Sequence, residues 1–294
     1  MPEFHVLAGP NGSGKSTFTR QVDSGLRRID YAIPPVINPD LIAQHLSPHD
    51  PDAAAGPAAR EALRLRGEAF AKRESFAIET TLSGNSELLL IEVAHAAGYL
   101  VTMTYIALSN ADLSVYRVAL RAREESRTVP AADVRRRYKR SLDNLSRVVA
   151  QIDVIHVVDN SGDDFWDVAR LERGRVVTVA KPIPLWAERA LAPQLALARD
   201  RTAIADHAVE RLRSVPSSRP RAQFVERALG ENETFAGMVI AATERHIAIS
   251  VSPQSFFIVE RAKLDRAVEP GQSVRVELSG ERCTVQIVEG GASF

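Results

Sequence analysis

A glycine-rich loop near the amino terminus constrains the fold of this chain more than any other stretch. Residues 7–17 read LAGPNGSGKST and fill every required position of the pattern G-x-x-x-x-G-K-[ST]. Residues 4–8 predict a short buried strand before the loop, and residues 16–22 predict a helix after it. A strand, a glycine loop and a helix in this order are typical of a phosphate-binding P-loop. A glycine-rich turn without a ligand is the alternative.

The residue types of the loop explain how it would hold phosphate. Glycines allow backbone angles that a Cβ hinders, so that successive N–H groups can surround phosphate oxygens. Lys15 supplies a positive charge for the β- and γ-phosphates, and the Ser16 hydroxyl can bind Mg²⁺. The expected binding residues are Gly9, Pro10, Asn11, Gly12, Ser13, Gly14, Lys15, Ser16 and Thr17.

Length and composition set wider limits. A chain of 294 residues suggests about two domains. Lys plus Arg equal Asp plus Glu at 37 each, so the summed charge predicts neither a nucleic-acid nor a membrane partner. We see no membrane-spanning apolar run and no secretory signal, and we therefore expect a cytoplasmic protein. The single cysteine, Cys283, excludes an internal disulfide, and no Cys/His cluster has the spacing of a zinc site.

Two acidic residues follow short apolar runs. Residues 36–37 predict a second strand, and Asp40 is expected as the N-cap of a helix over residues 41–46, a role that does not exclude catalysis. Glu79 ends the third apolar run, 76–78. Ligands of open α/β sheets gather outside the carboxyl ends of the strands, so Glu79 is expected at the mouth of the site, near metal and phosphates. A solvated glutamate at a strand end is the alternative.

Two basic helices are predicted after a fourth strand at 100–107. Arg117 and Arg121 are four residues apart and therefore project from one helix face. A second basic helix covers residues 131–147, and a fifth strand covers 154–158. Two arginine-bearing helices that flank a short loop are typical of a phosphate lid, although a solvated pair of charged helices has the same pattern.

Several motifs in this order resemble the zeta toxin family of small-molecule kinases over about residues 3–180. They are AGPNGSGKST at 8–17, NPD at 38–40, IETTLSG at 78–84, GY at 98–99, RV at 117–118, RRY at 136–138 and DNS at 159–161. The resemblance implies an α/β, nucleoside-kinase-like P-loop fold that uses ATP and Mg²⁺. It further implies phosphorylation of the 3′-hydroxyl of the amino sugar in UDP-N-acetylglucosamine, and a protein antitoxin as partner.

The resemblance also assigns roles to individual residues. Lys15 and Ser16 would hold phosphates and metal, and Asp40 would accept the proton of the substrate hydroxyl. The remaining roles are substrate contact by Glu79 and Thr81, stabilisation of the transferring phosphoryl group by Arg117 and Arg121, and contact near the adenine by Asn160.

One departure from the family pattern lies in the lid. Relatives carry Gly-Gly-His where this chain has Glu125, Ser126 and Arg127. Loss of two glycines should stiffen the lid, and Arg127 places a permanent charge there. Arg127 could replace a phosphate contact, or mark a different substrate or a weaker activity. A kinase of a nucleotide or antibiotic hydroxyl, and an ATP-binding regulator with a disabled lid, therefore remain alternatives.

The second half of the chain changes character. A last strand or hairpin is expected at 171–179, helical spacing at 186–213, a linker at 215–220 and a short helix at 222–229. Five short strands are then expected at 235–240, 246–251, 255–259, 273–278 and 283–287, which suggests a small antiparallel β-barrel. The predicted domains are 1–185 for the kinase, 186–230 for a helical segment and linker, and 231–294 for the β-rich domain.

This tail resembles the small β-domain at the end of Kfr-type plasmid proteins in its Gly-x-Val start, its Pro-Gly turn and its strand spacing. Partner docking, substrate restriction and inhibition of the kinase in cis are its candidate functions. A stabilising appendage without chemistry is the alternative, because a fold alone does not define a function.

Overall fold

The chain divides into two compact units, Met1–Gln194 and Leu195–Phe294. The computed structural model describes residues 1–125, 129–214, 223–230, 232–280 and 282–288, and of residues 123–125 it describes the backbone alone. Ser126 and Arg127 of the predicted lid, and the predicted linker 215–220, therefore lie outside the described residues.

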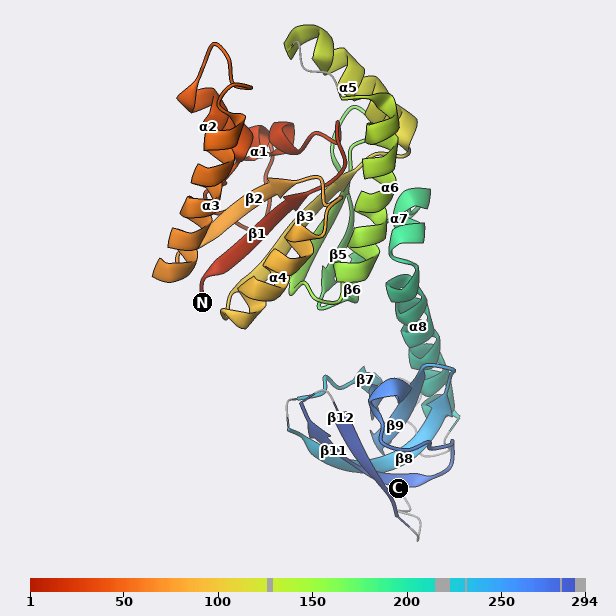
Figure 1. Ribbon diagram of the computed structural model, residues 1–294. Coiled ribbons are helices and arrows are strands. Elements are labelled where there is room, and N and C mark those ends of the chain that lie inside the picture. The colour runs from red at the N-terminus through yellow and green to blue at the C-terminus, as the bar shows by residue number, and fades with distance from the viewer. Residues whose placement is uncertain (126–128, 215–222, 231, 281, 289–294) are drawn as a thin grey trace. The chain divides into compact units, whose positions relative to one another are not determined.

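The first unit is an α/β structure built on a six-stranded sheet (Figure 1). Its elements are β1 (Glu3–Ala8), α1 (Lys15–Asp23), α2 (Pro39–Leu46), α3 (Ala55–Lys72), β2 (Phe76–Thr80), α4 (Ser86–Ala96), β3 (Leu100–Ala107), α5 (Ala111–Glu125), α6 (Ala131–Val148), β4 (Val154–Asp159), β5 (Trp166–Glu172), β6 (Arg175–Val179) and α7 (Leu185–Ala190). The predicted α/β fold, with a mostly parallel sheet and flanking helices, is confirmed.

The strand order β2-β1-β3-β4-β5-β6 places the P-loop strand β1 between β2 and β3. Strands β1 to β4 are parallel, whereas β5 and β6 are antiparallel. The next strand in the chain, β2, therefore lies on one side of β1, and the strand after it, β3, lies on the other side. Open α/β sheets bind ligands at such a switch point, outside the carboxyl ends of the strands.

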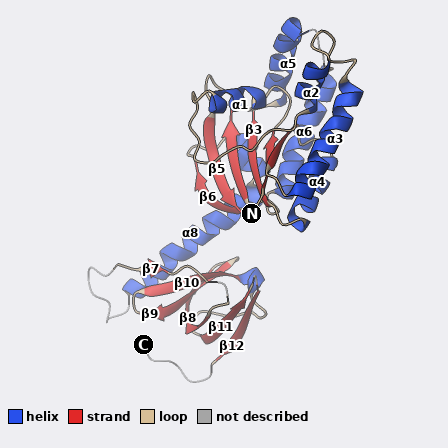
Figure 2. Ribbon diagram, turned by 90° about the vertical axis from the view of Figure 1, so that its left-hand side faces the viewer, coloured by secondary structure: helices blue, strands red, loops and turns tan. Residues whose placement is uncertain are grey.

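Helices cover both faces of this sheet. Figure 2 shows α4 and α6 on one face and α1 on the other. On the α1 face, Phe18 packs with Leu7 and Ile106 in a buried cluster. On the opposite face, the Tyr105 hydroxyl and the Ser141 hydroxyl of α6 are 2.9 Å apart. Burial on both faces explains why β1 and β3 are apolar over most of their length, and it provides a rigid base for the loops at the strand ends.

Helix α7 packs against the same unit. The Trp186 side chain is buried, and its indole Nε1–H donates to Asp159 Oδ2 at 2.6 Å. Its ring centroid lies 6.1 Å from that of Tyr105. The first compact unit thus includes residues just beyond the predicted boundary at 185.

Two predictions of secondary structure are wrong. Residues 36–37 do not form a strand: Val36 makes one isolated bridge to Ala77, and α2 begins at Pro39. Prolines before and after these residues lack the N–H groups that a longer ladder requires. The helix predicted at 222–229 is also absent from residues 223–230, where Val225–Glu226 instead form strand β7. Pairing of β7 with β10 overrides the weak helical propensity.

The second unit contains a second six-stranded sheet, of order β12-β11-β8-β9-β10-β7. Its elements are α8 (Ala192–Arg213), whose first three residues still belong to the first unit, β7 (Val225–Glu226), β8 (Thr234–Ala242), β9 (His246–Ser252), β10 (Ser255–Glu260), the 3₁₀ turn η1 (Arg261–Lys263), β11 (Ser273–Ser279) and β12 (Arg282–Ile287). Five of these strands match the predicted ones and pair antiparallel, whereas β7 is parallel to β10.

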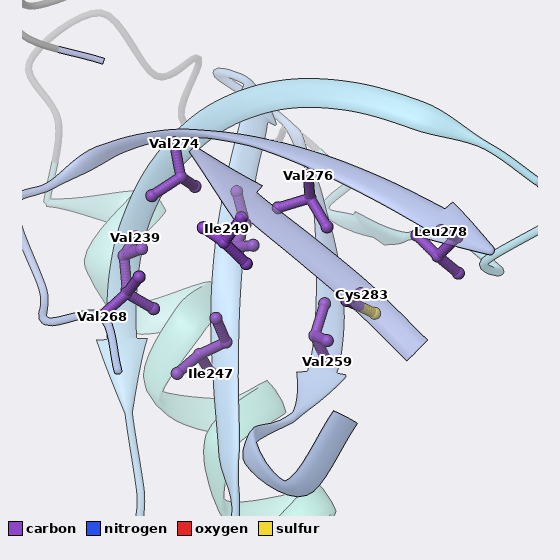
Figure 3. Close-up of a cluster of buried hydrophobic side chains, with 10 residues drawn as sticks. Val239, Ile247, Ile249, Val259, Val268, Val274, Val276, Leu278 and Cys283 are labelled. Carbon is purple, nitrogen blue, oxygen red and sulfur yellow. The ribbon is translucent and has the colours of Figure 1, made fainter. Parts of the chain in front are cut away.

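Alternating residues build the core of this second unit. Along β11, Val274, Val276 and Leu278 are buried while their neighbours are exposed or partly exposed, which is the period of a half-buried strand. Figure 3 shows these side chains together with those of Ile249 and Val259 in one apolar cluster. The second unit therefore has a hydrophobic core of its own.

Helix α8 covers another part of the second sheet. Ile204, Ala208 and Leu212, which share one helix face, pack with a cluster that contains Phe256 and Ile258. None of the helices in the described ranges is both long and apolar enough to cross a membrane.

Candidate active site

A cleft of about 900 Å³ lies at the carboxyl edge of the first sheet. Residues of the P-loop, α1, α2 and α5 line it, together with the end of β2 and the residues that follow β2 and β4. The predicted site residues in its wall are Asn11, Gly12, Gly14, Lys15, Ser16, Thr17, Asp40, Glu79, Thr81, Arg117, Arg121 and Asn160. The other predicted loop residues, Gly9, Pro10 and Ser13, are buried in the P-loop itself.

The P-loop requires glycine at two close contacts. Gly9 has φ of +145°, and a Cβ there would lie 1.9 Å from the Ile106 carbonyl oxygen. Gly14 has φ of +92°, and a Cβ there would lie 2.4 Å from Asn160 Nδ2. The loop thus packs against the ends of β3 and β4 too closely for any other residue.

Lys15 is folded over the P-loop. It is 8% exposed, and its Nζ donates to the carbonyl oxygens of Gly9 at 2.9 Å and Pro10 at 3.3 Å. Burial, together with the positive charge of Arg121, lowers the pKa of Lys15 to about 8, although the negative charge of Glu79 opposes this shift. An anionic phosphate would favour the charged form, so the lysine is suited to bind one.

Two polar atoms in the loop are buried without a partner. Neither Asn11 Oδ1 nor Ser13 Oγ has a hydrogen-bond partner within the described structure. The first turn of α1 also leaves backbone N–H groups at the cleft. Asn160 Nδ2 donates to the Ser13 carbonyl oxygen at 2.9 Å and so joins the end of β4 to this loop. Unpartnered polar atoms and a helix N-terminus fit the binding of a phosphate-bearing ligand.

Glu79 connects the P-loop to the start of α2. The Ser16 hydroxyl donates to the Glu79 carboxylate, with distances of 3.2 and 3.4 Å to its two oxygens. The Asn38 Nδ2 group donates to Glu79 Oε2 at 3.1 Å. A hydroxyl and a carboxylate, both suitable for a hard cation or its water ligands, therefore lie side by side.

Asp40 is not the N-cap that the sequence predicted. Asn38 caps α2, since its Oδ1 accepts from the Asp40 backbone N–H at 2.9 Å, and Pro39 occupies the first helical position. Proline is favoured there because its fixed φ suits a helix and its missing N–H is not needed. Asp40 consequently lies in the first turn of α2, in the wall of the cleft.

Helix α5 brings its arginines to the other wall. The Ser114 hydroxyl donates to the Asn11 carbonyl oxygen at 2.7 Å, which fixes α5 against the P-loop. Arg117 and Arg121 follow on this helix and line the cleft, and Arg117 Nη2 donates to the Gly162 carbonyl oxygen at 3.4 Å. Two guanidinium groups therefore face the same space as Lys15.

The family profile of zeta toxins matches residues 1–170. This chain belongs to the zeta toxin family. The matched part contains the whole predicted constellation of P-loop, acidic residues and arginines, and the family is one of P-loop kinases, as the motifs had indicated.

Comparisons with individual proteins found one sequence relative and several solved structures of similar fold. An uncharacterized protein of Haemophilus influenzae is 32% identical over 131 residues, which cover 44% of this chain and 88% of the relative. The crystal structure of AvrRxo1-ORF1:AvrRxo1-ORF2 with sulphate ions has a TM-score of 0.50 at 17% identity, and the match covers 66% of this chain and 65% of that one. This chain thus covers slightly less than two thirds of that solved chain, and the likeness shows the fold alone.

A second similar structure comes from the PezAT chromosomal toxin-antitoxin system of Streptococcus pneumoniae. It has a TM-score of 0.46 at 14% identity and covers 69% of this chain and 86% of that one.

Several cleft residues were not predicted from the sequence. Thr19, Arg20 and Asp23 of α1 line the cleft, as do Leu41 and Gln44 of α2. The three residues of α1 could have been found from their spacing, because residues three, four and seven positions after Ser16 share its helix face. Asp163 and Phe165, in the loop after β4, complete the wall beside Asn160.

Proposed function

We propose that this chain is an ATP-dependent kinase that transfers the γ-phosphate to a hydroxyl of a small molecule. The observation that supports this most directly is the meeting, in one cleft, of the P-loop lysine Lys15, the carboxylate of Asp40 and the guanidinium of Arg117. Phosphoryl transfer needs a phosphate cradle, a group that orients the acceptor hydroxyl, and cations for the developing charge.

The nucleotide would bind along the P-loop. The backbone N–H groups of Gly12 and of Gly14 to Thr17, with the Lys15 ammonium, would hold its phosphates, and Ser13 would gain a partner for its buried hydroxyl. Ser16 would hold Mg²⁺, with Glu79 beside it. When bound, the metal neutralises phosphate charge during transfer.

Asp40 would orient and deprotonate the acceptor hydroxyl. A carboxylate within hydrogen-bond reach of an alcohol can take its proton as the oxygen attacks phosphorus. Arg117 and Arg121 would stabilise the charge that develops on the transferring group. The family resemblance supports UDP-N-acetylglucosamine as acceptor, phosphorylated on the 3′-hydroxyl of its amino sugar, with Glu79 and Thr81 as substrate contacts.

The family also supports a biological setting. We place the reaction in the cytoplasm and expect a protein antitoxin that blocks the cleft. Such a partner would be needed because phosphorylation of a cell-wall precursor would harm the host.

The substitution Asp40→Asn tests the assignment of the base. It should lower transfer at least about 100-fold, because the isosteric amide cannot accept the proton. ATP binding, measured by fluorescence titration with a labelled nucleotide, should change less than about threefold, since the contacts of the P-loop remain. A fully active Asp40→Asn protein would refute this role.

A further inference from the structure

We propose that Asn38 is a positioning residue. It fixes Ser16 and Glu79, the expected metal side of the cleft, relative to Asp40, the expected base. This inference rests on the proposed function, because it concerns the distance between the group that receives the nucleotide and the group that activates the acceptor. Nothing in the family motifs distinguishes this role from simple helix capping, whereas the contacts of the side chain do.

Asn38 uses both ends of its amide. Its Oδ1 accepts from the Asp40 backbone N–H at 2.9 Å, and its Nδ2 donates to Glu79 Oε2 at 3.1 Å. The two partners define the orientation of the amide, because an N–H requires an acceptor and a carboxylate requires a donor. Ser or Asp would cap the helix equally well, but Asp could not donate to Glu79.

The carboxylate of Glu79 extends this connection to the P-loop. Both of its oxygens lie within 3.4 Å of the Ser16 hydroxyl, which donates to them. Ser16, Glu79 and Asn38 come from α1, β2 and the start of α2. A continuous chain of hydrogen bonds therefore runs from the expected metal ligand to the turn that carries Asp40.

The backbone around Asn38 is already held independently of its side chain. The Ile37 N–H donates to the Ala77 carbonyl oxygen at 2.8 Å, and the Ala77 N–H donates to the Pro35 carbonyl oxygen at 2.9 Å. These bonds attach the entry to α2 to β2, two residues before Glu79. Loss of the Asn38 donor should therefore leave the fold intact and release the carboxylate.

The expected consequence is a change in reaction geometry. Effective transfer requires the acceptor oxygen and the γ-phosphate to be held in line, and a displacement of about 1 Å can cost on the order of 100-fold in rate. The bond between Asn38 and Glu79 limits such displacement because it couples the two sides directly.

The test is Asn38→Asp, which keeps the cap but replaces the donor to Glu79 with a carboxylate oxygen that repels it. We expect kcat for UDP-N-acetylglucosamine phosphorylation to fall on the order of 100-fold, with KM for ATP within about threefold and a thermal unfolding transition that stays cooperative. The matched control is Asn110→Asp, since Asn110 Oδ1 accepts from the Leu113 N–H at 2.9 Å at the start of α5, outside the cleft lining. Its kcat should stay within about twofold of the wild type. If Asn38→Asp also retains kcat within about threefold, Asn38 is a cap only and the proposal is wrong.

A second measurement separates this inference from the proposed function. In ¹⁵N spectra, the side-chain amide pair of Asn38, assigned by its loss in Asn38→Asp, should shift in Glu79→Ala while the pair of Asn110 does not. An unshifted Asn38 pair would overturn the connection whatever the activity. Failure of the proposed function would appear differently, as a wild-type protein that binds ATP and phosphorylates no acceptor.

Discussion

Raising the pH from 7 to 9 should weaken ATP binding about tenfold, because Lys15 loses its proton in the free protein. Burial lowers the pKa of Lys15 to about 8. The bound phosphates favour the protonated lysine and raise its pKa, so binding takes up a proton wherever the free protein lacks one.

The magnitude follows from the protonated fraction. With a pKa of about 8, roughly 90% of the free protein carries the proton at pH 7 and about 10% carries it at pH 9. If the complex stays protonated throughout, the apparent association constant falls by the ratio of these fractions, which is about tenfold, or about 1.4 kcal/mol. The affinity for ATP thus falls as the pH rises through about 8, and it has its full value well below that pH.

Isothermal titration in buffers of different ionisation enthalpy would measure both quantities. We expect uptake of about half a proton per ATP at pH 8 and about 0.9 at pH 9. Lys15→Arg is the control, because a guanidinium does not titrate in this range, and its affinity should not depend on pH in this way. An affinity for the wild type that stays constant up to pH 9, with no proton uptake, would refute the argument.

Two further substitutions test the packing of the first unit. Gly14→Ala should abolish measurable ATP binding, because its Cβ would lie 2.4 Å from Asn160 Nδ2 at φ of +92°; binding at wild-type affinity would show that the loop can adjust. Trp186→Phe should lower the free energy of unfolding of the first unit by about 1–3 kcal/mol, since it removes the 2.6 Å bond to Asp159. Denaturant titration followed by circular dichroism measures the loss, and an unchanged midpoint would contradict it.

Local patterns predicted most of the first unit. Buried parallel strands are short apolar runs, so β1, β3 and β4 were recognisable before their neighbours were known. The topology then placed Glu79 and Asn160 at the same edge as the P-loop, because strand ends of a parallel sheet converge there.

Features that depend on tertiary contacts were not predictable. Asn38 and Asp40 are both good N-caps; Pro39 at the first helical position was a sequence signal for Asn38 that the prediction missed, whereas the contact of Asn38 with Glu79 is visible only in the structure. Strand β7 has two residues and exists through its pairing with β10. The predicted domain boundary at residue 185 separates Trp186 from the first unit, whereas the structure bonds Trp186 to Asp159 within that unit. The role of each site residue remains a prediction.

The central claim is that the cleft phosphorylates a sugar nucleotide, and one measurement tests it most directly. The purified chain would be incubated with ATP and Mg²⁺, with and without UDP-N-acetylglucosamine, beside Lys15→Ala, and the sugar nucleotide would be analysed by mass spectrometry. We expect a product that carries one additional phosphate, formed by the wild type and absent with Lys15→Ala. An unmodified sugar nucleotide, from a protein shown separately to bind ATP, would contradict it.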